Sequence, residues 1–421
     1  MCGINGFNFR DRSLAARMKN FTRSRGPDAE GEYSDEYFTI LHDRLSILDL
    51  SSNANQPMVF KNLVITFNGE IYNFKELQNE LVNDGYKFNT NCDTEVILYL
   101  FHKYDIQAFK KLSGIFALAI WDKFNKKLYL VRDNVGVKPL YYHFKNSEKK
   151  FYFSSSIRSL LECSNIKKLN ENVLFHYSNF GRNDLKETVF KNIFKLAPGE
   201  LLTFDQNKKE YSLKKFLNFK LEKTNFSNLE IKDIIEKTIN SQLISDVPLA
   251  LSLSGGVDSN VIYSVMRKRF DNNFNIYSFY FKDYEKFNGD FYTAQKNAKF
   301  YKTSFFPIEI SHKDFIDSAE KSVEILEEPL ANQCSILNYK MANTINEKIL
   351  ITGDGGDEIF TGYDSYRSIH IVYLIQKLNF FKNLKVYFGP KNFRRLFINN
   401  PKDMYISFSE QNIYEDLRKY Y

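Results

Sequence analysis

Residues 248–260 read PLALSLSGGVDSN and decide the fold predicted for the second half of the chain. Leucines alternate at positions 249, 251 and 253, which indicates a strand, and apolar residues return at helical spacing from Val261 to Met266. A loop between a strand and a helix presents backbone N–H groups, and the helix dipole favours negative charge there. A bare Gly-Gly pair would indicate an ordinary turn, but the whole stretch predicts a phosphate-binding loop. It lacks the lysine of the Walker pattern, so a kinase-type loop is the weaker interpretation.

A second loop of the same kind follows further along the chain. Residues 353–363 read GDGGDEIFTGY and come directly after the apolar run 348–352. Apolar runs at 276–281, 306–310 and 348–352 alternate with helical patterns, which is typical of a doubly wound parallel sheet. Ligands of such sheets bind beyond the carboxyl ends of the strands, so the two loops should face each other. The acidic loop is therefore predicted to hold magnesium and to take part in catalysis; the alternative is a flexible acidic turn.

The composition limits the class of protein. The chain has 421 residues, which favours two domains, and 43% of them are hydrophobic. Its net charge of +7 comes from lysines scattered among aromatic residues, which argues against a nucleic-acid-binding surface. The four cysteines form no C-x-x-C pair, which predicts neither a disulfide framework nor a zinc site. The sequence contains no signal peptide and no apolar run of membrane-spanning length, so a cytoplasmic protein without membrane or nucleic-acid partners is expected.

Cys2 is the first candidate for chemistry. Removal of Met1 would leave Cys2 with a free α-amine, whose reference pKa is about 8. That amine can act, directly or through water, as the base for the thiol of the same residue. Cys2 is therefore a candidate nucleophile.

The rest of the first half carries several short motifs near predicted strand and helix ends. Asn68-Gly69 follows the strand predicted at 63–67 and on its own predicts a type I′ hairpin turn. Helices are predicted at 73–83 and 92–104, and strands at 38–41, 115–121, 127–132 and 151–155. The motifs are RGPD (25–28, interpreted as a turn with an exposed charge pair), HDRLSILD (42–49), NGEIYN (68–73), CDTE (92–95) and GVKPLYY (136–142).

These motifs, with MCGI at the start, resemble the glutaminase domain of class II glutamine amidotransferases. With the two later loops, the whole chain resembles the glutamine-dependent asparagine synthetases. The resemblance implies an α+β Ntn-hydrolase sandwich (αββα) over residues 1–206 and a linker over 207–228. An α/β ATP-pyrophosphatase domain of the HUP-like type, with the doubly wound parallel sheet, would follow over 229–421.

The resemblance also implies residue roles in the first domain. Cys2 would attack the side-chain amide of glutamine. Such a reaction needs donors where the oxyanion develops and charged partners for a zwitterionic amino acid. Guanidinium groups suit carboxylates, and carboxylates suit ammonium groups. By resemblance, Asn68 and the Gly69 amide form the oxyanion hole, Arg44 holds the α-carboxylate of glutamine, and Glu70 and Asp93 hold its α-amino group.

In the second domain the resemblance implies ATP and Mg²⁺ sites. Asp258 and Asp357 would hold magnesium that bridges the phosphates, and Asp354 would be the acidic residue at the reacting centre. The expected ATP contacts are Leu253, Ser254, Gly255, Gly256, Asp258, Ser259, Phe279, Thr352 and Gly353.

Some positions depart from the family pattern. Ser156 stands where the family usually has an acidic residue, Thr352 replaces a serine, Tyr280 a glycine and Leu330 an aromatic residue. After a helical pattern at 409–421, the chain ends at Tyr421 without the family's later lysine and its Glu-x-Arg-x-Pro-Phe-x-Asp motif. We expect a fragment whose ATP-pyrophosphatase domain is truncated at the C-terminus, with a naturally short form as the alternative.

The predicted function is ATP-dependent synthesis of asparagine from aspartate, through an acyl-adenylate, with ammonia from glutamine. One alternative is a related amidotransferase with a different carboxylate acceptor, such as a sugar acid, a peptide or a β-amino acid. The other is a glutaminase or nucleotide-binding protein that lacks synthetase activity. A homodimer is compatible with the sequence, which does not establish the oligomeric state.

Overall fold

A computed structural model describes residues 1–164, 168–217, 224–329, 333–363 and 366. The chain forms two compact units. The first consists of Met1–Asn170 and Leu185–Pro248, and the second of Glu171–Asp184 and the chain from Leu249 onward. The segment Glu171–Asp184, which carries α5 (Glu171–Phe180), thus belongs to the second unit, although the chain before and after it belongs to the first.

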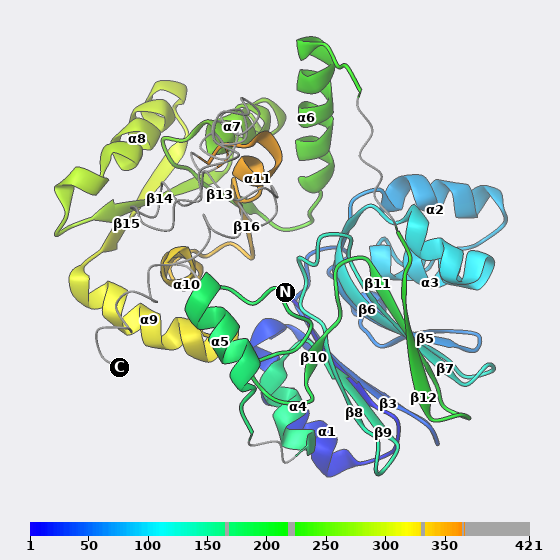
Figure 1. The fold of residues 1–421 in the computed structure, drawn as a ribbon. Helices are drawn as coiled ribbons and strands as arrows, with labels where there is room; N and C mark the ends of the chain where they lie inside the picture. The colour runs from blue at the N-terminus through cyan, green and yellow to red at the C-terminus, as the bar shows by residue number, and fades with distance from the viewer. Residues whose placement is uncertain (165–167, 218–223, 330–332, 364–365, 367–421) are drawn as a thin grey trace, which may run out of the picture. The chain divides into compact units, whose positions relative to one another are not determined.

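The first unit contains two six-stranded sheets, and their strands pair antiparallel (Figure 1). One sheet has the order β10-β8-β9-β1-β3-β2. Its strands are β1 (Gly3–Phe7), β2 (Ala29–Ser34), β3 (Thr39–Arg44), β8 (Tyr141–Lys145), β9 (Lys150–Ser154) and β10 (Phe194–Lys195). The other has the order β12-β11-β7-β6-β5-β4. Its strands are β4 (Met58–Phe60), β5 (Leu63–Ile71), β6 (Gly114–Asp122), β7 (Lys127–Arg132), β11 (Glu200–Asp205) and β12 (Glu210–Lys215).

Helices cover the outer faces of these two sheets (Figure 1). The first sheet carries α1 (Arg12–Lys19) and α4 (Ile157–Ser164), and the second carries α2 (Phe74–Asn83) and α3 (Asp93–Tyr104). The remaining helices are η1 (Arg23–Arg25), η2 (Ser52–Ala54), η3 (Asp105–Lys111) and α6 (Asn228–Gln242). Alternate side chains of each strand point to opposite faces, so Val64 packs between the sheets while Ile65 packs against the helices. The predicted αββα sandwich is confirmed.

Two local predictions for this unit are wrong. Asn68-Gly69 is not a hairpin turn, because β5 continues through both residues to Ile71 and pairs with β6 along its whole length. A Cβ atom at Gly69 would lie 2.2 Å from the carbonyl oxygen of Ile115, so a glycine is needed for close strand packing and not for a turn. The polar stretch predicted as linker contains β12, which pairs with β11 at the sheet edge.

The second unit contains a four-stranded parallel sheet of order β15-β14-β13-β16, as predicted. Tyr277 contributes to a core cluster with side chains of α9 and α10, whereas Tyr280 packs against Phe291 of α8, so helices lie on both faces of the sheet. The strands are β13 (Leu249–Ser252), β14 (Asn275–Phe281), β15 (Ser304–Ile310) and β16 (Ile349–Ile351). The helices are α7 (Val257–Phe270), η4 (Glu285–Phe287), α8 (Gly289–Tyr301), α9 (His312–Leu326), α10 (Cys334–Ala342) and α11 (Gly356–Phe360). The helix predicted at 409–421 lies outside the described residues. Over the described part of the chain, no helix combines the length and apolarity that a membrane crossing requires.

Candidate active sites

Cys2 lies directly before β1, and three backbone contacts hold it. Its Sγ is 3.4 Å from the backbone nitrogen of Leu45, which donates to it, and 3.8 Å from the Leu45 carbonyl oxygen. Arg25 donates through Nε to the carbonyl oxygen of Cys2 at 3.2 Å. The exposed charge pair predicted for the RGPD motif holds for Asp28, which is exposed and accepts the Ser46 backbone N–H at 2.7 Å, but not for Arg25, which is half-buried against Cys2.

The Cys2 thiol is largely shielded from solvent. Burial raises the pKa of the Cys2 thiol, while the Leu45 N–H and the positive chain terminus act in the opposite direction. Burial lowers the pKa of the Met1 α-amine to about 5, so this amine is neutral at pH 7. This amine belongs to Met1, whereas the base predicted for the thiol is the α-amine that Cys2 itself would carry once Met1 is removed.

Asn68 lies in the middle of β5 with a side chain that is only 1% exposed. Its Nδ2 is buried and has no hydrogen-bond partner among the described residues. A buried donor without a partner costs about 1–3 kcal/mol, so such groups are rare unless they serve a ligand or a reaction. The structure therefore leaves a donor available at the position predicted for the oxyanion hole.

Glu70 and Asp93 form a pair of interacting carboxyl groups. Asp93 is the first residue of α3 and accepts the Ile71 backbone N–H at 3.0 Å. Burial raises the pKa of Asp93 to about 7, although the backbone N–H groups of Ile71 and Thr94 lower it. Burial, and then the charge of Asp93, raise the pKa of Glu70 well above its ordinary value. Desolvation and mutual repulsion both favour the protonated form of this pair, and a cation bound beside it would favour ionisation instead.

Arg44, the last residue of β3, is only 5% exposed. Its guanidinium group is held in place by neutral acceptors. It donates to the carbonyl oxygens of Leu48, Asp49 and Ser51 and to Oδ1 of Asn55. These hydrogen-bond partners are all uncharged oxygens.

The sequence analysis assigned no role to Lys138 of the GVKPLYY motif, which the structure brings within electrostatic reach of this site. Burial lowers the pKa of the Lys138 ammonium, and the charges of Glu70 and Cys2 oppose that effect. The loop that carries Lys138 is held by Asp133 and Arg132 at the end of β7. Asp133 accepts the backbone N–H groups of Phe116, Val135, Val137 and Lys138, and Arg132 donates to the carbonyl oxygens of Gly136, Lys138 and Leu196.

The acidic residue that the family pattern places at position 156 is a serine here, and it has a structural use. Ser156 is buried directly before α4, where its Oγ accepts the Ser159 N–H at 3.2 Å. Its own backbone N–H donates to Oγ of Ser154 at 2.9 Å. Ser156 therefore caps a helix, which a serine does well.

In the second unit, the loop between β13 and α7 is organised by its hydroxyl groups. The Oγ atoms of Ser254 and Ser259 are 3.0 Å apart. The Gly256 N–H donates to Oγ of Ser254 at 3.1 Å, and Asn260 donates through Nδ2 to the Gly256 carbonyl oxygen at 2.7 Å. Leu253, at the start of the loop, is buried in the sheet. The strand, loop and helix follow one another as predicted.

The two predicted loops of this unit meet, because β13 and β16 are neighbours in the parallel sheet. A Cβ atom at Gly356 would lie 2.4 Å from Oδ2 of Asp258, and one at Gly353 would lie 3.3 Å from the backbone nitrogen of Ser259. Glycine is therefore required where the acidic loop passes the phosphate-loop residues. Thr352 donates to Oδ2 of Asp354 at 2.9 Å within the acidic loop.

The carboxylates around this loop are a partial match for a magnesium site. Asp258 lies against Gly356, the residue before Asp357, so both carboxylates belong to adjoining segments. Carboxylate oxygens are the ligands that Mg²⁺ prefers, usually together with phosphate oxygens and water. Within the described ranges, however, no group of three acidic, histidine or cysteine residues is arranged to hold a metal ion by itself. The residues therefore fit a metal whose remaining ligands come from a phosphate-bearing substrate.

The structure gives less support for a role of Phe279 in binding ATP, and it does not describe Leu330. Phe279 is half-buried and packs with the core cluster on the α9 and α10 side of the sheet. Tyr280, on the opposite face, packs against Phe291, with ring centroids 5.1 Å apart and the rings tilted by 56°. Leu330 lies outside the described residues.

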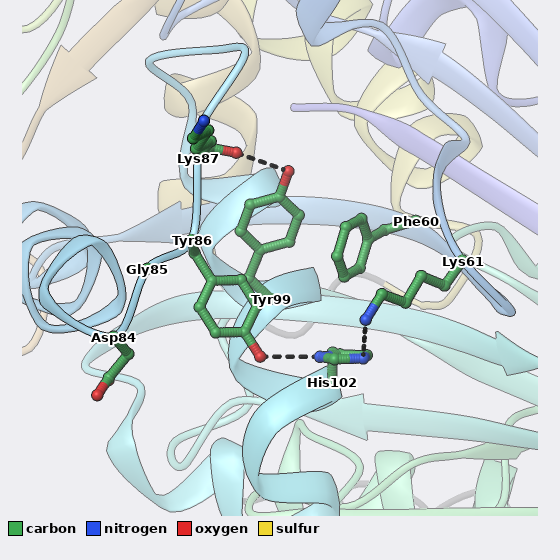
Figure 2. A pocket seen from close by; sticks show the side chains of 8 residues that line it. All are labelled: Phe60, Lys61, Asp84, Gly85, Tyr86, Lys87, Tyr99 and His102. Carbon is green, nitrogen blue, oxygen red and sulfur yellow. Dashed lines mark hydrogen bonds between the residues drawn. The ribbon is translucent and has the colours of Figure 1, made fainter.

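One hollow in the first unit lies apart from all these residues (Figure 2). It has a volume of about 380 Å³. Figure 2 shows that His102 bridges Tyr86 and Lys61, at 2.8 Å from the Tyr86 hydroxyl and 3.0 Å from the Lys61 ammonium. Its polar side chains are thus paired with one another, and we assign the hollow no ligand. The lining residues are Phe60, Lys61, Asp84, Gly85, Tyr86, Lys87, Tyr99 and His102.

Comparison with known families agrees with this geometry. Residues 1–217 match the model of the glutamine amidotransferase domain, and the chain belongs to that family. Residues 230–397 match the model of asparagine synthase. The two matches lie in the order in which Cys2 and the phosphate-type loop occur along the chain.

Several curated relatives are named as glutamine-hydrolyzing asparagine synthetases. Asparagine synthetase [glutamine-hydrolyzing] 1 of Bacillus subtilis is 34% identical over 87% of this chain and 60% of its own length. A putative asparagine synthetase of Methanocaldococcus jannaschii is 29% identical over 90% of this chain and 78% of its own. Asparagine synthetase B of Escherichia coli is 28% identical over 86% of this chain and 65% of its own length. The chain thus spans 60% of the length of the Bacillus subtilis relative. Among solved structures, glutamine phosphoribosylpyrophosphate amidotransferase of B. subtilis matches at 14% identity and a TM-score of 0.40, over 73% of this chain and 66% of that one.

Proposed function

We propose that this chain carries out glutamine-dependent, ATP-dependent synthesis of asparagine from aspartate. The observation that supports the glutaminase half best is the unpartnered Asn68 Nδ2 in the unit that presents Cys2. The synthetase half is supported by the meeting of the phosphate-type loop with the acidic loop at Gly356. The similarity to curated asparagine synthetases over more than four fifths of the chain favours aspartate as the acceptor.

In the first step Cys2 acts as the nucleophile. The α-amine left after removal of Met1 accepts the thiol proton, and sulfur attacks the side-chain amide carbon of glutamine. Asn68 Nδ2 and the Gly69 N–H donate to the oxyanion that develops. The C–N bond breaks, ammonia leaves with the proton, and a thioester to Cys2 remains. Water then hydrolyses the thioester to give glutamate and the free thiol.

Charge complementarity selects glutamine in this proposal. The buried guanidinium of Arg44 binds the α-carboxylate, and Glu70 and Asp93 bind the α-ammonium. The carboxyl pair must be at least partly ionised for this role. Its raised pKa values therefore make glutamine binding depend on pH near neutrality.

We expect the KM for glutamine to fall by about tenfold between pH 6 and pH 8, because Asp93, with a pKa of about 7, ionises over that interval. In Asp93→Asn the KM should be high and should change less between pH 6 and pH 8, because only Glu70 of the pair remains. Steady-state glutamate production at five pH values would measure both. A wild-type KM that is flat or rises with pH would remove Asp93 from ammonium binding.

The raised pKa of Asp93 also makes stability depend on pH: a rise in pH that favours glutamine binding lowers the stability of the fold. Folding raises the pKa of Asp93 from 3.8 to about 7, so the folded state retains a proton that the unfolded state loses. The contribution of this group to stability is therefore lost as the pH rises through that window. Asp93→Asn should raise Tm at pH 8, by about 2–4 °C for each kcal/mol recovered.

In the second unit, the phosphates of ATP would bind at Ser254, Gly255, Gly256 and Ser259, with Leu253, Phe279, Thr352 and Gly353 as further contacts. Asp258 and Asp357 would hold Mg²⁺, which when bound would neutralise phosphate charge. The aspartate β-carboxylate attacks the α-phosphorus and releases pyrophosphate, giving an acyl-adenylate. Ammonia then attacks the acyl carbon and AMP leaves, with Asp354 as the acidic residue near this centre.

We expect Asp258→Asn to lower aspartate-dependent exchange of pyrophosphate into ATP by about 100-fold or more, because one metal-binding charge is lost. Asp317→Asn, an exposed aspartate on α9, is the matched control and should leave the exchange unchanged. Equal effects of the two substitutions would contradict the metal role of Asp258. Exchange that needs a carboxylate other than aspartate would instead favour a different acceptor, and binding of ATP without exchange would favour a protein without synthetase activity.

A further inference from the structure

A continuous chain of buried hydrogen bonds runs beneath the strand that presents Cys2. It links Ser156, which directly precedes α4, with β9, β1, the segment before η1, and β3. Each of its side chains is fully or almost fully buried. The bonds are Ser156 N–H to Ser154 Oγ (2.9 Å), Ser154 Oγ to Asn5 Oδ1 (2.6 Å), Asn5 Nδ2 to Thr22 Oγ1 (2.7 Å) and Thr22 Oγ1 to Asp43 Oδ2 (2.6 Å).

The donors in this chain all point the same way. Asn5 donates its amide N–H to Thr22, so the single hydroxyl proton of Thr22 points to another acceptor. Asp43 Oδ2 at 2.6 Å is much nearer than the Lys19 carbonyl oxygen at 3.5 Å and is the stronger acceptor. Asp43 accepts this bond through Oδ2, while its Oδ1 is buried without a partner among the described residues. A carboxylate at the end of such a chain polarises each bond before it. Asp43 is thus the terminal acceptor that orients the whole set.

The Asp43 end of the chain lies directly behind the nucleophile. Gly3, the residue after Cys2, pairs with Asp43 across β1 and β3. A Cβ atom at Gly3 would lie 2.6 Å from Cβ of Thr22 and 3.1 Å from Oδ2 of Asp43, so the backbone at Gly3 sits against both side chains.

Thr22 also anchors the segment that reaches the other side of Cys2. The backbone N–H of Arg25 donates to the Thr22 carbonyl oxygen at 2.9 Å, and Arg25 in turn donates to the carbonyl oxygen of Cys2. A shift of Thr22 would therefore move two of the backbone contacts that set the position of Cys2.

We propose that Thr22 and Asp43 are positioning residues for Cys2: their hydrogen bond fixes Gly3 and Arg25 and thereby holds the thiol at the Leu45 N–H. This role rests on the proposed glutaminase reaction. Both side chains are fully buried, so the pair is expected to act on the rate of attack and not on substrate binding. Displacement of a reacting group by about 1 Å can cost two orders of magnitude in rate.

The test is Thr22→Val, which keeps the shape of the side chain and removes the hydroxyl. We expect kcat for glutamine hydrolysis to fall by about 10- to 100-fold with KM within about twofold of the wild-type value. Thr22→Ser, which restores the hydroxyl, should return kcat to within about threefold. Thr39→Val is the matched control, because Thr39 is also a buried threonine of β1–β3 pairing that donates from Oγ1, to the Phe9 carbonyl oxygen at 2.8 Å, at the end of β3 away from Cys2.

A second measurement separates this proposal from the proposed function. The apparent pKa of Cys2, obtained from the pH dependence of its alkylation by iodoacetamide, should rise in Thr22→Val because the thiol leaves the Leu45 N–H. Mass spectrometry of the N-terminal peptide reports Cys2 alone. A wild-type protein that is alkylated but never hydrolyses glutamine would contradict the proposed function, and the shift in Cys2 pKa would still test the positioning.

Asp43→Leu and the double variant Thr22→Val/Asp43→Leu complete a double-mutant cycle. If the two residues act as one unit, Thr22→Val and Asp43→Leu should each lower kcat, and the double variant should lose no more than the larger single loss. Should Thr22→Val fail to fold, Thr22→Ala keeps the Cβ that contacts Gly3 and carries the same expectation. Additive losses, a KM effect without a kcat effect, or an equal loss in Thr39→Val would each overturn the positioning role.

Discussion

Cys2→Ala is expected to lower glutamine hydrolysis by at least about 1,000-fold, the scale seen when a covalent nucleophile is removed. No other group described in this unit can form the thioester. The remaining free cysteines, Cys92, Cys163 and Cys334, show none of the contacts that set Cys2 apart, namely the Leu45 N–H and the bond from Arg25. Glutamate release measured with purified wild type and variant tests this directly.

The control for this experiment is Cys163→Ala. Cys163 lies on α4 and its pKa is raised by burial, which makes it an unreactive thiol. It should retain wild-type hydrolysis. If the proposed two-step function holds, Cys2→Ala should also retain aspartate-dependent pyrophosphate exchange, because that reaction needs no glutamine. Glutamine hydrolysis that survives in Cys2→Ala would mean that the nucleophile is a different residue.

The parts of the fold that could be predicted from sequence are those set by local patterns. The helix α3 follows from apolar spacing after Cys92-Asp93, and the parallel sheet follows from apolar runs alternating with helices. The meeting of the two loops of the second unit also followed, because parallel neighbours expose their carboxyl ends on one edge. Each of these inferences needs only a short window of sequence and a general rule.

Long-range packing explains what local reasoning missed. Asn68-Gly69 has the local preference of a turn, but the pairing of β5 with β6 overrides that preference. Strand β8 and the edge strand β12 are short and partly polar, so their apolar signal is weak. The Thr22–Asp43 hydrogen bond joins residues 21 positions apart, and the Ser154–Asn5 bond joins residues 149 apart. No sequence pattern marks such pairs before the strands are placed.

In the candidate site too, the sequence predicts residue types but not the properties that depend on long-range packing. Residue types such as cysteine, arginine and paired carboxyl groups indicate acyl-transfer chemistry from sequence alone. Their electrostatic state does not follow from type, since Asp93 reaches a pKa of about 7 only through its burial at the start of α3. Lys138 is a similar case, because its approach to Glu70 and Cys2 depends on how Asp133 and Arg132 fold their loop.

Asn68→Ala is the second substitution with a large expected effect. Loss of one oxyanion donor typically lowers kcat by about 100- to 1,000-fold, with little change in KM, because the bond forms mainly in the transition state. In the free protein, however, Asn68 Nδ2 is a buried donor without a partner in the described chain. Its removal should therefore leave Tm unchanged or raise it.

This opposition between activity and stability distinguishes a catalytic donor from a structural one. Asn62→Ala is the matched control, because Asn62 lies just before β5 and donates through Nδ2 to Asp122 at 2.6 Å. Its loss should lower Tm and leave kcat unchanged. Thermal unfolding and steady-state hydrolysis on the two variants give four values. If Asn68→Ala lost stability and activity together, Asn68 would be a packing residue, and the oxyanion would need another donor beside the Gly69 amide.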